Sequence, residues 1–99
     1  MSDKKKWYAQ NSKVGDAFNA FYKSCEEDTV LDKKTVELMK LALACVFRCP
    51  HCTDQHVKKA LDAGASKQEV TEALLIAAVE GAGTQLAWRK ETFKKYLSE

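Results

Sequence analysis

Apolar residues recur at helical spacing along most of this 99-residue chain. In the stretch SKVGDAFNAFYKSC (12–25), Val14, Phe18, Phe21 and Cys25 are four, three and four residues apart and share one helical face. The stretch KKTVELMKLALACVF (33–47) begins amphipathic and becomes apolar on nearly all sides after Leu41. Such a pattern is typical of a helix buried against several neighbours.

Helix boundaries follow from proline, glycine and capping residues. The residue before Pro50 avoids helical angles, so the first buried helix ends there and a second begins, with Cys49 at or near its cap. That second helix covers 50–63, and Gly64 is a natural stop. The sequence SKQE from Ser66 to Glu69 is a capping box that opens a third.

The C-terminal third of the chain predicts two further features. The segment VTEALLIAAVEGAG (70–83) is small and apolar, and its Gly81 and Gly83 either end the helix or allow close contact. A last helix over 84–97 carries Leu86, Phe93 and Leu97 on one face. The sequence therefore predicts an all-α fold of about five helices, with a single domain over 11–99 behind a polar tail over 1–10.

Composition and charge narrow the classes of function. Hydrophobic residues make up 45% and charged residues 30%, with a net charge of +2, which fits a globular protein without a nucleic-acid surface. No apolar run approaches the roughly 18 residues of a membrane span, and the N-terminus does not read as a signal peptide. We therefore expect a cytoplasmic protein that binds neither nucleic acid nor membranes, with its cysteines made as thiols.

The stretch ACVFRCPHCTDQH (44–56) holds three of the four cysteines and both histidines. Structural zinc needs four ligands, typically as two separated pairs, and no second cluster is present. The spacing of Cys45, Cys49 and Cys52 can hold an iron–sulfur cluster, but Cys45 falls in the apolar helix as a small buried residue would. Covalent haem requires histidine directly after Cys52, where Thr53 stands. We expect no cofactor.

A redox pair suits the same stretch better. Cys49 and Cys52 lie at the start of a helix, where backbone N–H groups and the helix dipole favour a thiolate. His56 follows four residues after Cys52 on the same face and can act as a base. If the two buried helices pack antiparallel, Glu37 reaches a similar height and can orient His56. His51 either tunes the thiols or is simply exposed. The alternative is that Glu37 is merely solvated and His56 structural.

The order Glu37, eleven residues, Cys49, two residues, Cys52, three residues, His56 resembles the signature of AhpD-like alkylhydroperoxidases, within the carboxymuconolactone decarboxylase family. The segment LDAGASKQEVTEALLIAAVEGAG (61–83) is also similar to the one that follows the family's motif. The resemblance implies an all-α homo-oligomer, commonly a trimer or hexamer. It also implies a Glu37–His56 proton relay, with His51 matching a histidine inside the motif of some members. Better-characterised alkylhydroperoxidases carry a doubled helical unit, whereas this chain has one.

The expected function is a thiol-dependent peroxidase in which Cys52 attacks a hydroperoxide and Cys49 resolves the product. The opposite order, with Cys49 attacking, stays open. The expected electron donor is a dithiol, such as a lipoyl group, a thioredoxin-like protein or a small thiol. The main alternative is a disulfide reductase that supplies a separate peroxiredoxin. A decarboxylase-type lyase does not call for the cysteine pair, and a non-catalytic helical assembly module would leave its thiols at their ordinary pKa.

Overall fold

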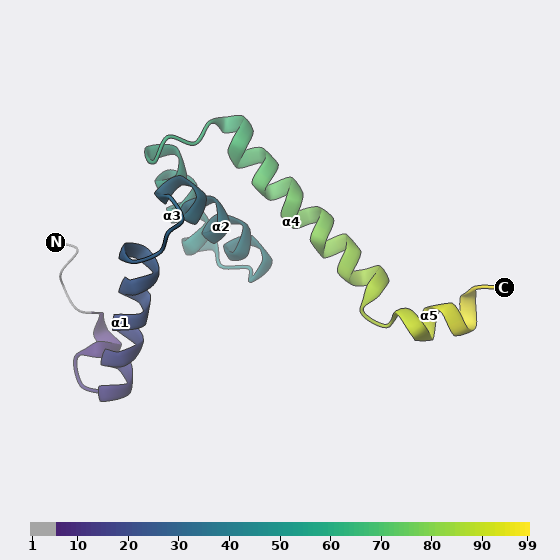
Figure 1. The fold of residues 1–99 in the computed structure, drawn as a ribbon, viewed down its shortest axis with the longest axis horizontal. Coiled ribbons are helices and arrows are strands. Elements are labelled where there is room, and N and C mark those ends of the chain that lie inside the picture. Colours follow the sequence, from purple (N-terminus) through teal and green to yellow (C-terminus); the bar gives the residue numbers. More distant parts are fainter. Residues whose placement is uncertain (1–5) are drawn as a thin grey trace. The chain divides into compact units, whose positions relative to one another are not determined.

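The computed structural model describes residues 6–99, and all of the regular structure in this range is helical (Figure 1). A short 3-10 turn, η1 (Trp7–Ala9), precedes five helices: α1 (Lys13–Glu27), α2 (Lys33–Val46), α3 (Pro50–Asp62), α4 (Lys67–Ala87) and α5 (Lys90–Leu97). The predicted all-α fold of about five helices is confirmed. The chain forms two compact units, which divide between Lys33 and Lys34.

The first unit consists of η1 and α1. Ser12 caps α1 by accepting a hydrogen bond of 3.2 Å from the N–H of Gly15. The carbonyl of Tyr8 occupies the space that a Cβ atom at position 15 would need, so only glycine permits this close approach. The Tyr8 ring meets Phe18 edge-on, with 5.5 Å between ring centroids. Residues 7–9 of the predicted tail thus form a turn on α1, while residues 1–5 of that tail lie outside the described residues.

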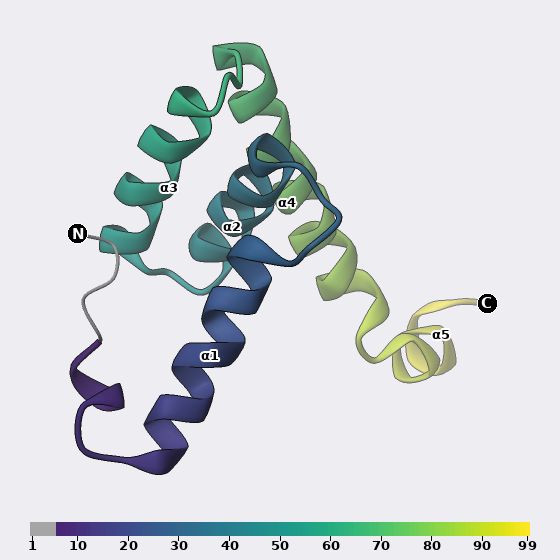
Figure 2. The ribbon, with the colours of Figure 1, turned by 60° about the vertical axis from the view of Figure 1, so that its left-hand side comes forward.

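The second unit is organised around an antiparallel pair, α2 and α3. Two side-chain contacts join these helices, Glu37 to His56 and Cys45 to Thr53. Residue numbers rise along α2 as they fall along α3, so the helices run in opposite directions (Figure 2). The predicted boundaries, 33–47 and 50–63, each differ from the observed ones by a single residue.

The core of the second unit is small. Its buried apolar residues are Leu41 and Ala44 of α2, Ala60 of α3, and Ala65. Leu41 and Glu37 are the largest fully buried side chains among the described residues. A carboxyl group therefore lies in the centre of the packing, one turn from Leu41, where it requires a partner to offset its desolvation.

Helix α4 starts as predicted and ends later than predicted. Ser66 and Glu69 form the expected capping box, and Lys34 Nζ lies 2.9 Å from Glu69 Oε2, which ties the start of α4 to α2. The helix continues through Gly81 and Gly83, where an added Cβ would meet nothing within 4 Å. These glycines therefore do not end the helix, contrary to the first alternative, and within the described residues nothing packs closely against them. An exposed glycine costs only about 1 kcal/mol, which the neighbouring helix formers outweigh.

The predicted last helix over 84–97 is divided in two. Residues 84–87 belong to α4, a turn follows at Trp88 and Arg89, and α5 starts at Lys90. Leu86 therefore does not share a helix with Phe93 and Leu97, contrary to the prediction. Figure 1 shows α4 running away from α2 and α3, with α5 at its far end. Within residues 6–99, no helix has both the length and the apolar character needed to cross a bilayer.

Candidate active site

The turn that joins α2 to α3 determines where the cysteine pair lies. The N–H of Cys49 donates to the Ala44 carbonyl at 3.0 Å, and the N–H of Arg48 donates to the Cys45 carbonyl at 3.2 Å. This is the Schellman pattern of helix termination, which needs a left-handed residue at its centre. Arg48 takes that conformation, with φ of 57°. A residue with a Cβ pays roughly 1–2 kcal/mol there, so the turn before Cys49 is strained.

Cys49 is the N-cap of α3, as the sequence predicts, with Pro50 in the first helical position. Its Sγ accepts a hydrogen bond of 3.2 Å from the N–H of Cys52. A disulfide joins the two cysteines, whose Cα atoms are 5.2 Å apart. An N–H directed at sulfur, together with the positive end of a helix, stabilises negative charge on that sulfur. Cys49 is therefore placed to be a thiolate when the disulfide is open.

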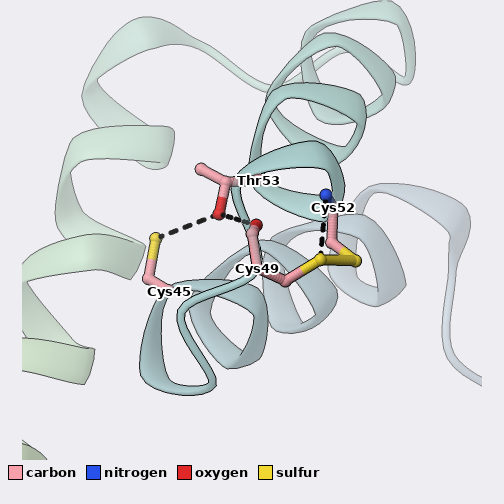
Figure 3. Close-up of a disulfide and its surroundings, with 4 residues drawn as sticks. All are labelled: Cys45, Cys49, Cys52 and Thr53. Atoms are coloured by element: carbon pink, nitrogen blue, oxygen red, sulfur yellow. Dashed lines mark hydrogen bonds between the residues drawn. A yellow bond between two sulfur atoms is a disulfide. The ribbon is translucent and has the colours of Figure 1, made fainter.

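Thr53 links Cys45 to this cap. Its Oγ1 donates to the Cys49 carbonyl at 2.8 Å and lies 3.9 Å from Cys45 Sγ. Because Thr53 uses its single proton on the carbonyl, the Cys45 thiol acts as the donor in the second contact. Figure 3 shows the Cys45 sulfur directed at Thr53, on the side away from the disulfide. The three cysteines of the C-x3-C-x2-C spacing thus do not converge on one point.

Glu37 and His56 meet in the core between α2 and α3. His56 Nδ1 lies 2.7 Å from Glu37 Oε1, the Glu37 residue is 0% exposed, and His56 is 8% exposed. A carboxylate oxygen accepts, so Nδ1 donates to Glu37 Oε1, which in a neutral imidazole leaves the lone pair on Nε2. In a low-dielectric interior such a hydrogen bond is strong and fixes the orientation of the ring. His56 also follows Cys52 by four residues, on the same face of α3. The contact with Glu37 suits an imidazole held in a fixed orientation on the helix that carries Cys52.

The remaining residues with candidate chemistry lie outside this arrangement. His51 is exposed in the first turn of α3, and Cys25 is exposed on α1 in the other compact unit. In the described part of the chain, no three side chains of His, Cys, Asp or Glu gather as metal ligands do.

Sequence reasoning missed two residues of the site, Arg48 and Thr53. The signal for Arg48 was the absence of glycine in FRCP, where one helix ends and another begins within three residues. A helix that ends in this way must place another residue in the left-handed region. The signal for Thr53 was its position four residues after Cys49, from which a hydroxyl reaches the carbonyl of the cap.

Comparisons with known proteins identify the family of this chain. Residues 12–91 match the Carboxymuconolactone decarboxylase family. Over 74 residues the chain is 40% identical to "Uncharacterized protein 4 in cox locus" of Paracoccus denitrificans, which covers 75% of this chain and 67% of that protein. The crystal structure of a Methanobacterium thermoautotrophicum protein matches with a TM-score of 0.74 and 27% identity, covering 85% of this chain and 97% of that one. The matched range contains the four motif residues from Glu37 to His56, and the chain belongs to the carboxymuconolactone decarboxylase family.

Proposed function

We propose that this protein is a thiol-dependent peroxidase of the AhpD-like kind. The observation that carries the proposal is the buried hydrogen bond between Glu37 of α2 and His56 of α3. The same helix α3 has the Cys49–Cys52 disulfide at its start. A buried carboxylate and imidazole in contact are costly to desolvate, and they supply what thiol chemistry requires, an oriented base. Family membership supports the same conclusion.

The first half of the cycle oxidises Cys52. His56 Nε2 takes the proton from the Cys52 thiol, while Glu37 holds the Nδ1–H side of the ring. The thiolate attacks the distal oxygen of a hydroperoxide, so an S–O bond forms and the O–O bond breaks. The leaving alkoxide takes the proton from His56 and departs as an alcohol, which leaves a sulfenic acid on Cys52.

The second half of the cycle forms and reopens the disulfide. The Cys49 thiolate, stabilised by the Cys52 N–H, attacks the sulfenic sulfur, and the hydroxyl leaves as water after protonation. An external dithiol then reduces the disulfide by two successive exchanges and becomes a disulfide itself. The cycle uses no metal or organic cofactor. Its resting dithiol state requires a reducing compartment such as the cytoplasm, with a lipoyl group or a thioredoxin-like protein as donor.

Reaction with a hydroperoxide tests the proposal directly. The fully reduced protein receives one equivalent of cumene hydroperoxide, and its intact mass is followed. We expect the loss of two hydrogens, mapped to Cys49 and Cys52. Cys52→Ser abolishes this reaction, Cys49→Ser accumulates a sulfenic acid on Cys52 that dimedone traps, and the control Cys25→Ser reacts like the parent. Thiols that stay free in the unsubstituted protein would refute the peroxidase. A dimedone adduct on Cys49 of Cys52→Ser, with none on Cys52 of Cys49→Ser, would reverse the two roles.

The base has its own test. We expect His56→Gln to slow peroxide consumption by about 100-fold or more, since a general base contributes that much. Glu37→Gln removes the carboxylate acceptor and slows the reaction less, because the imidazole remains. Equal rates for His56→Gln and the parent protein would exclude His56 as the base.

A second candidate function is a disulfide reductase or adaptor that delivers electrons to a separate peroxiredoxin. The hydrogen bond from the Cys52 N–H to Cys49 Sγ favours it, because a sulfur stabilised at a helix cap suits thiol–disulfide exchange. Purified protein that consumes peroxide with only a small dithiol present supports the peroxidase. Protein that needs an added peroxiredoxin supports the adaptor.

We also propose that the chain acts as a homo-oligomer, a trimer or a hexamer. Several large apolar side chains of α2 and α4 are exposed in the single chain, namely Met39, Leu43, Val46, Leu75, Ile76, Val79 and Leu86. Exposed apolar surface of this extent is usually covered by a partner. A native mass three or six times that of the chain is expected, and Ile76→Asp with Val79→Asp should reduce it. A monomer at micromolar concentration would refute the proposal.

A further inference from the structure

Arg48 occupies a position where its side chain costs stability. It is the left-handed residue of the α2 turn, with φ of 57°, and it directly precedes Cys49. The equivalent position at the end of α3 is glycine, Gly64, with φ of 98°. The Arg48 side chain is exposed, and it makes no hydrogen bond or ion pair with any of residues 6–99. No contact within the described chain therefore accounts for an arginine at this position.

Among residues 34–99, neither the first turn of α3 nor the ion pairs of this unit supply Arg48 with a carboxylate partner. The first turn of α3 contains no acidic residue, and the positive end of that helix dipole lies at Cys49. Glu37 is buried against His56, and Asp54 lies beyond the first turn. Arg48 and the positive end of the α3 dipole are thus two positive groups directly beside Cys49 in the sequence. A carboxylate fits this setting best, because a guanidinium binds it with two parallel hydrogen bonds.

We propose that Arg48 is a specificity-determining residue that binds the carboxylate of an anionic oxidised substrate as that substrate reacts with the Cys49–Cys52 pair. The inference rests on the proposed function in taking these cysteines as the redox pair. The substrate is a disulfide or hydroperoxide with a carboxylate a few bonds from its reacting S–S or O–O bond. In the disulfide case the Cys52 thiolate attacks one substrate sulfur and releases a thiolate. Cys49 then attacks the mixed disulfide and releases the second, so the substrate is reduced and the protein pair oxidised.

Two probe disulfides separate recognition of the anion from reactivity of the thiol. Dithiobis(nitrobenzoate) carries two carboxylates, whereas dithiodipyridine is neutral at neutral pH. The reduced protein, in a Cys25→Ser background, is mixed with each probe, and the Cys49–Cys52 disulfide is followed by intact mass. The variants are Arg48→Asn, which is neutral and tolerates left-handed angles, and Arg48→Lys, which keeps the charge. Arg89→Asn, at the α4–α5 turn, makes the same change in net charge at the far end of α4.

We expect Arg48→Asn to slow the anionic probe by about two- to fivefold, the size of one exposed charge pair, without slowing the neutral probe. Arg48→Lys retains most of the rate, Arg89→Asn retains all of it, and added salt reduces the difference. If the protein is a peroxidase, Arg48→Asn should likewise slow the reaction with a fatty-acid hydroperoxide, which is anionic, and leave the rate with neutral cumene hydroperoxide unchanged.

Three results would overturn the inference. Equal slowing of both probes would mean that Arg48 acts on the thiols rather than on the substrate. Unchanged rates with both would mean that it has no role at the pair. A change in native mass in Arg48→Asn would assign it to an interface between copies. The exchange reaction involves no peroxide, so a protein inert to peroxide that still prefers the anionic probe would refute the peroxidase and leave the anion preference standing.

Discussion

The ends of α2 and α3 solve the same backbone problem with different residues. In each, an N–H bonds the carbonyl five residues back at 3.0 Å, Cys49 to Ala44 and Ala65 to Ala60. In each, the preceding N–H bonds the carbonyl three residues back, at 3.2 Å for Arg48 and 3.0 Å for Gly64. Both turns are Schellman motifs, and both lead directly into the next helix.

The two turns differ in the residues at the left-handed position and at the cap of the next helix. The α3 turn has Gly64 in the left-handed position, and Ser66 with Glu69 forms a complete capping box for α4. The α2 turn has Arg48 in that position and a cysteine as the cap of α3. The α3 turn is thus built from residues that stabilise it, whereas the α2 turn has a strained arginine and a cysteine of the proposed redox pair.

The largest expected effect comes from replacing the reactive cap by an ordinary one. Cys49→Ser keeps a good N-cap, so the reduced variant should unfold within about 1 kcal/mol of the reduced parent protein. It should form no Cys49–Cys52 disulfide with diamide, while the parent loses two hydrogens in intact mass. Loss of helicity in the variant would show that the Cys49 sulfur is needed for the fold. Cys49 would then be a stabilising cap like Ser66.

Gly64→Ala tests the stabilising turn. An added Cβ meets nothing within 4 Å, so the effect isolates the backbone angle. We expect a loss of about 1–2 kcal/mol in the free energy of unfolding by urea. Gly81→Ala, in the exposed interior of α4, is the matched control and should add up to about 1 kcal/mol. A loss at both positions would point to tight packing rather than to the angle.

Ser66→Ala removes the hydroxyl that caps α4, where α3 has the sulfur of Cys49 instead. The N–H of Glu69 loses its 3.0 Å acceptor, and the unfolding free energy should fall by about 1 kcal/mol. Oxidation of the cysteine pair by diamide should be unchanged, because the cap serves α4 alone. A slower oxidation would mean that the two turns are coupled.

Arg48→Gly gives the α2 turn the residue that the α3 turn has in its left-handed position. Relief of the left-handed strain outweighs the extra entropy of an unfolded glycine, so we expect a gain of about 0.5–1 kcal/mol in urea unfolding. The variant should also lose the preference for the anionic probe. A fall in stability would show that the arginine side chain makes contacts that support the fold.

The smallest effect is acid weakening of the α4 cap. The hydrogen bond from the Ser66 N–H, followed by that from Lys34, lowers the pKa of Glu69 below its ordinary 4.5. The folded state therefore favours the carboxylate, and its contribution is present above that ordinary pKa and lost as pH falls through the folded pKa. The urea midpoint of unfolding should fall less for Glu69→Gln than for the parent chain when the pH is lowered from about 6 to about 3. The same pH dependence in Glu69→Gln and the parent chain would contradict a stabilising role for the Glu69 carboxylate.

Capping explains how much of this fold was predictable. The starts of α3 and α4 follow from side chains that accept hydrogen bonds from their own backbone, and the stop at Gly64 follows from a residue without a Cβ in the left-handed position. A short stretch of sequence contains all of this information. The turn at Trp88 and Arg89 has no such signal, because Arg89 makes no side-chain cap, and there the predicted boundary was wrong. The site divides in the same way. His56 falls on the face of Cys52 through helical periodicity alone, and the roles of Glu37, Cys49, Cys52, His51 and His56 stay predictions.

The sequence by itself determined the all-α fold, the cysteine pair at a helix start and the histidine four residues later, since each depends on contacts within one or two helical turns. The tertiary structure decided that Glu37 meets His56 at 2.7 Å in the core, because that contact depends on how α2 and α3 pack. It also turned Cys45 towards Thr53 and away from the disulfide. Finally, it placed Arg48 in the left-handed region, because the hydrogen bonds of the Schellman turn at the end of α2 require that conformation.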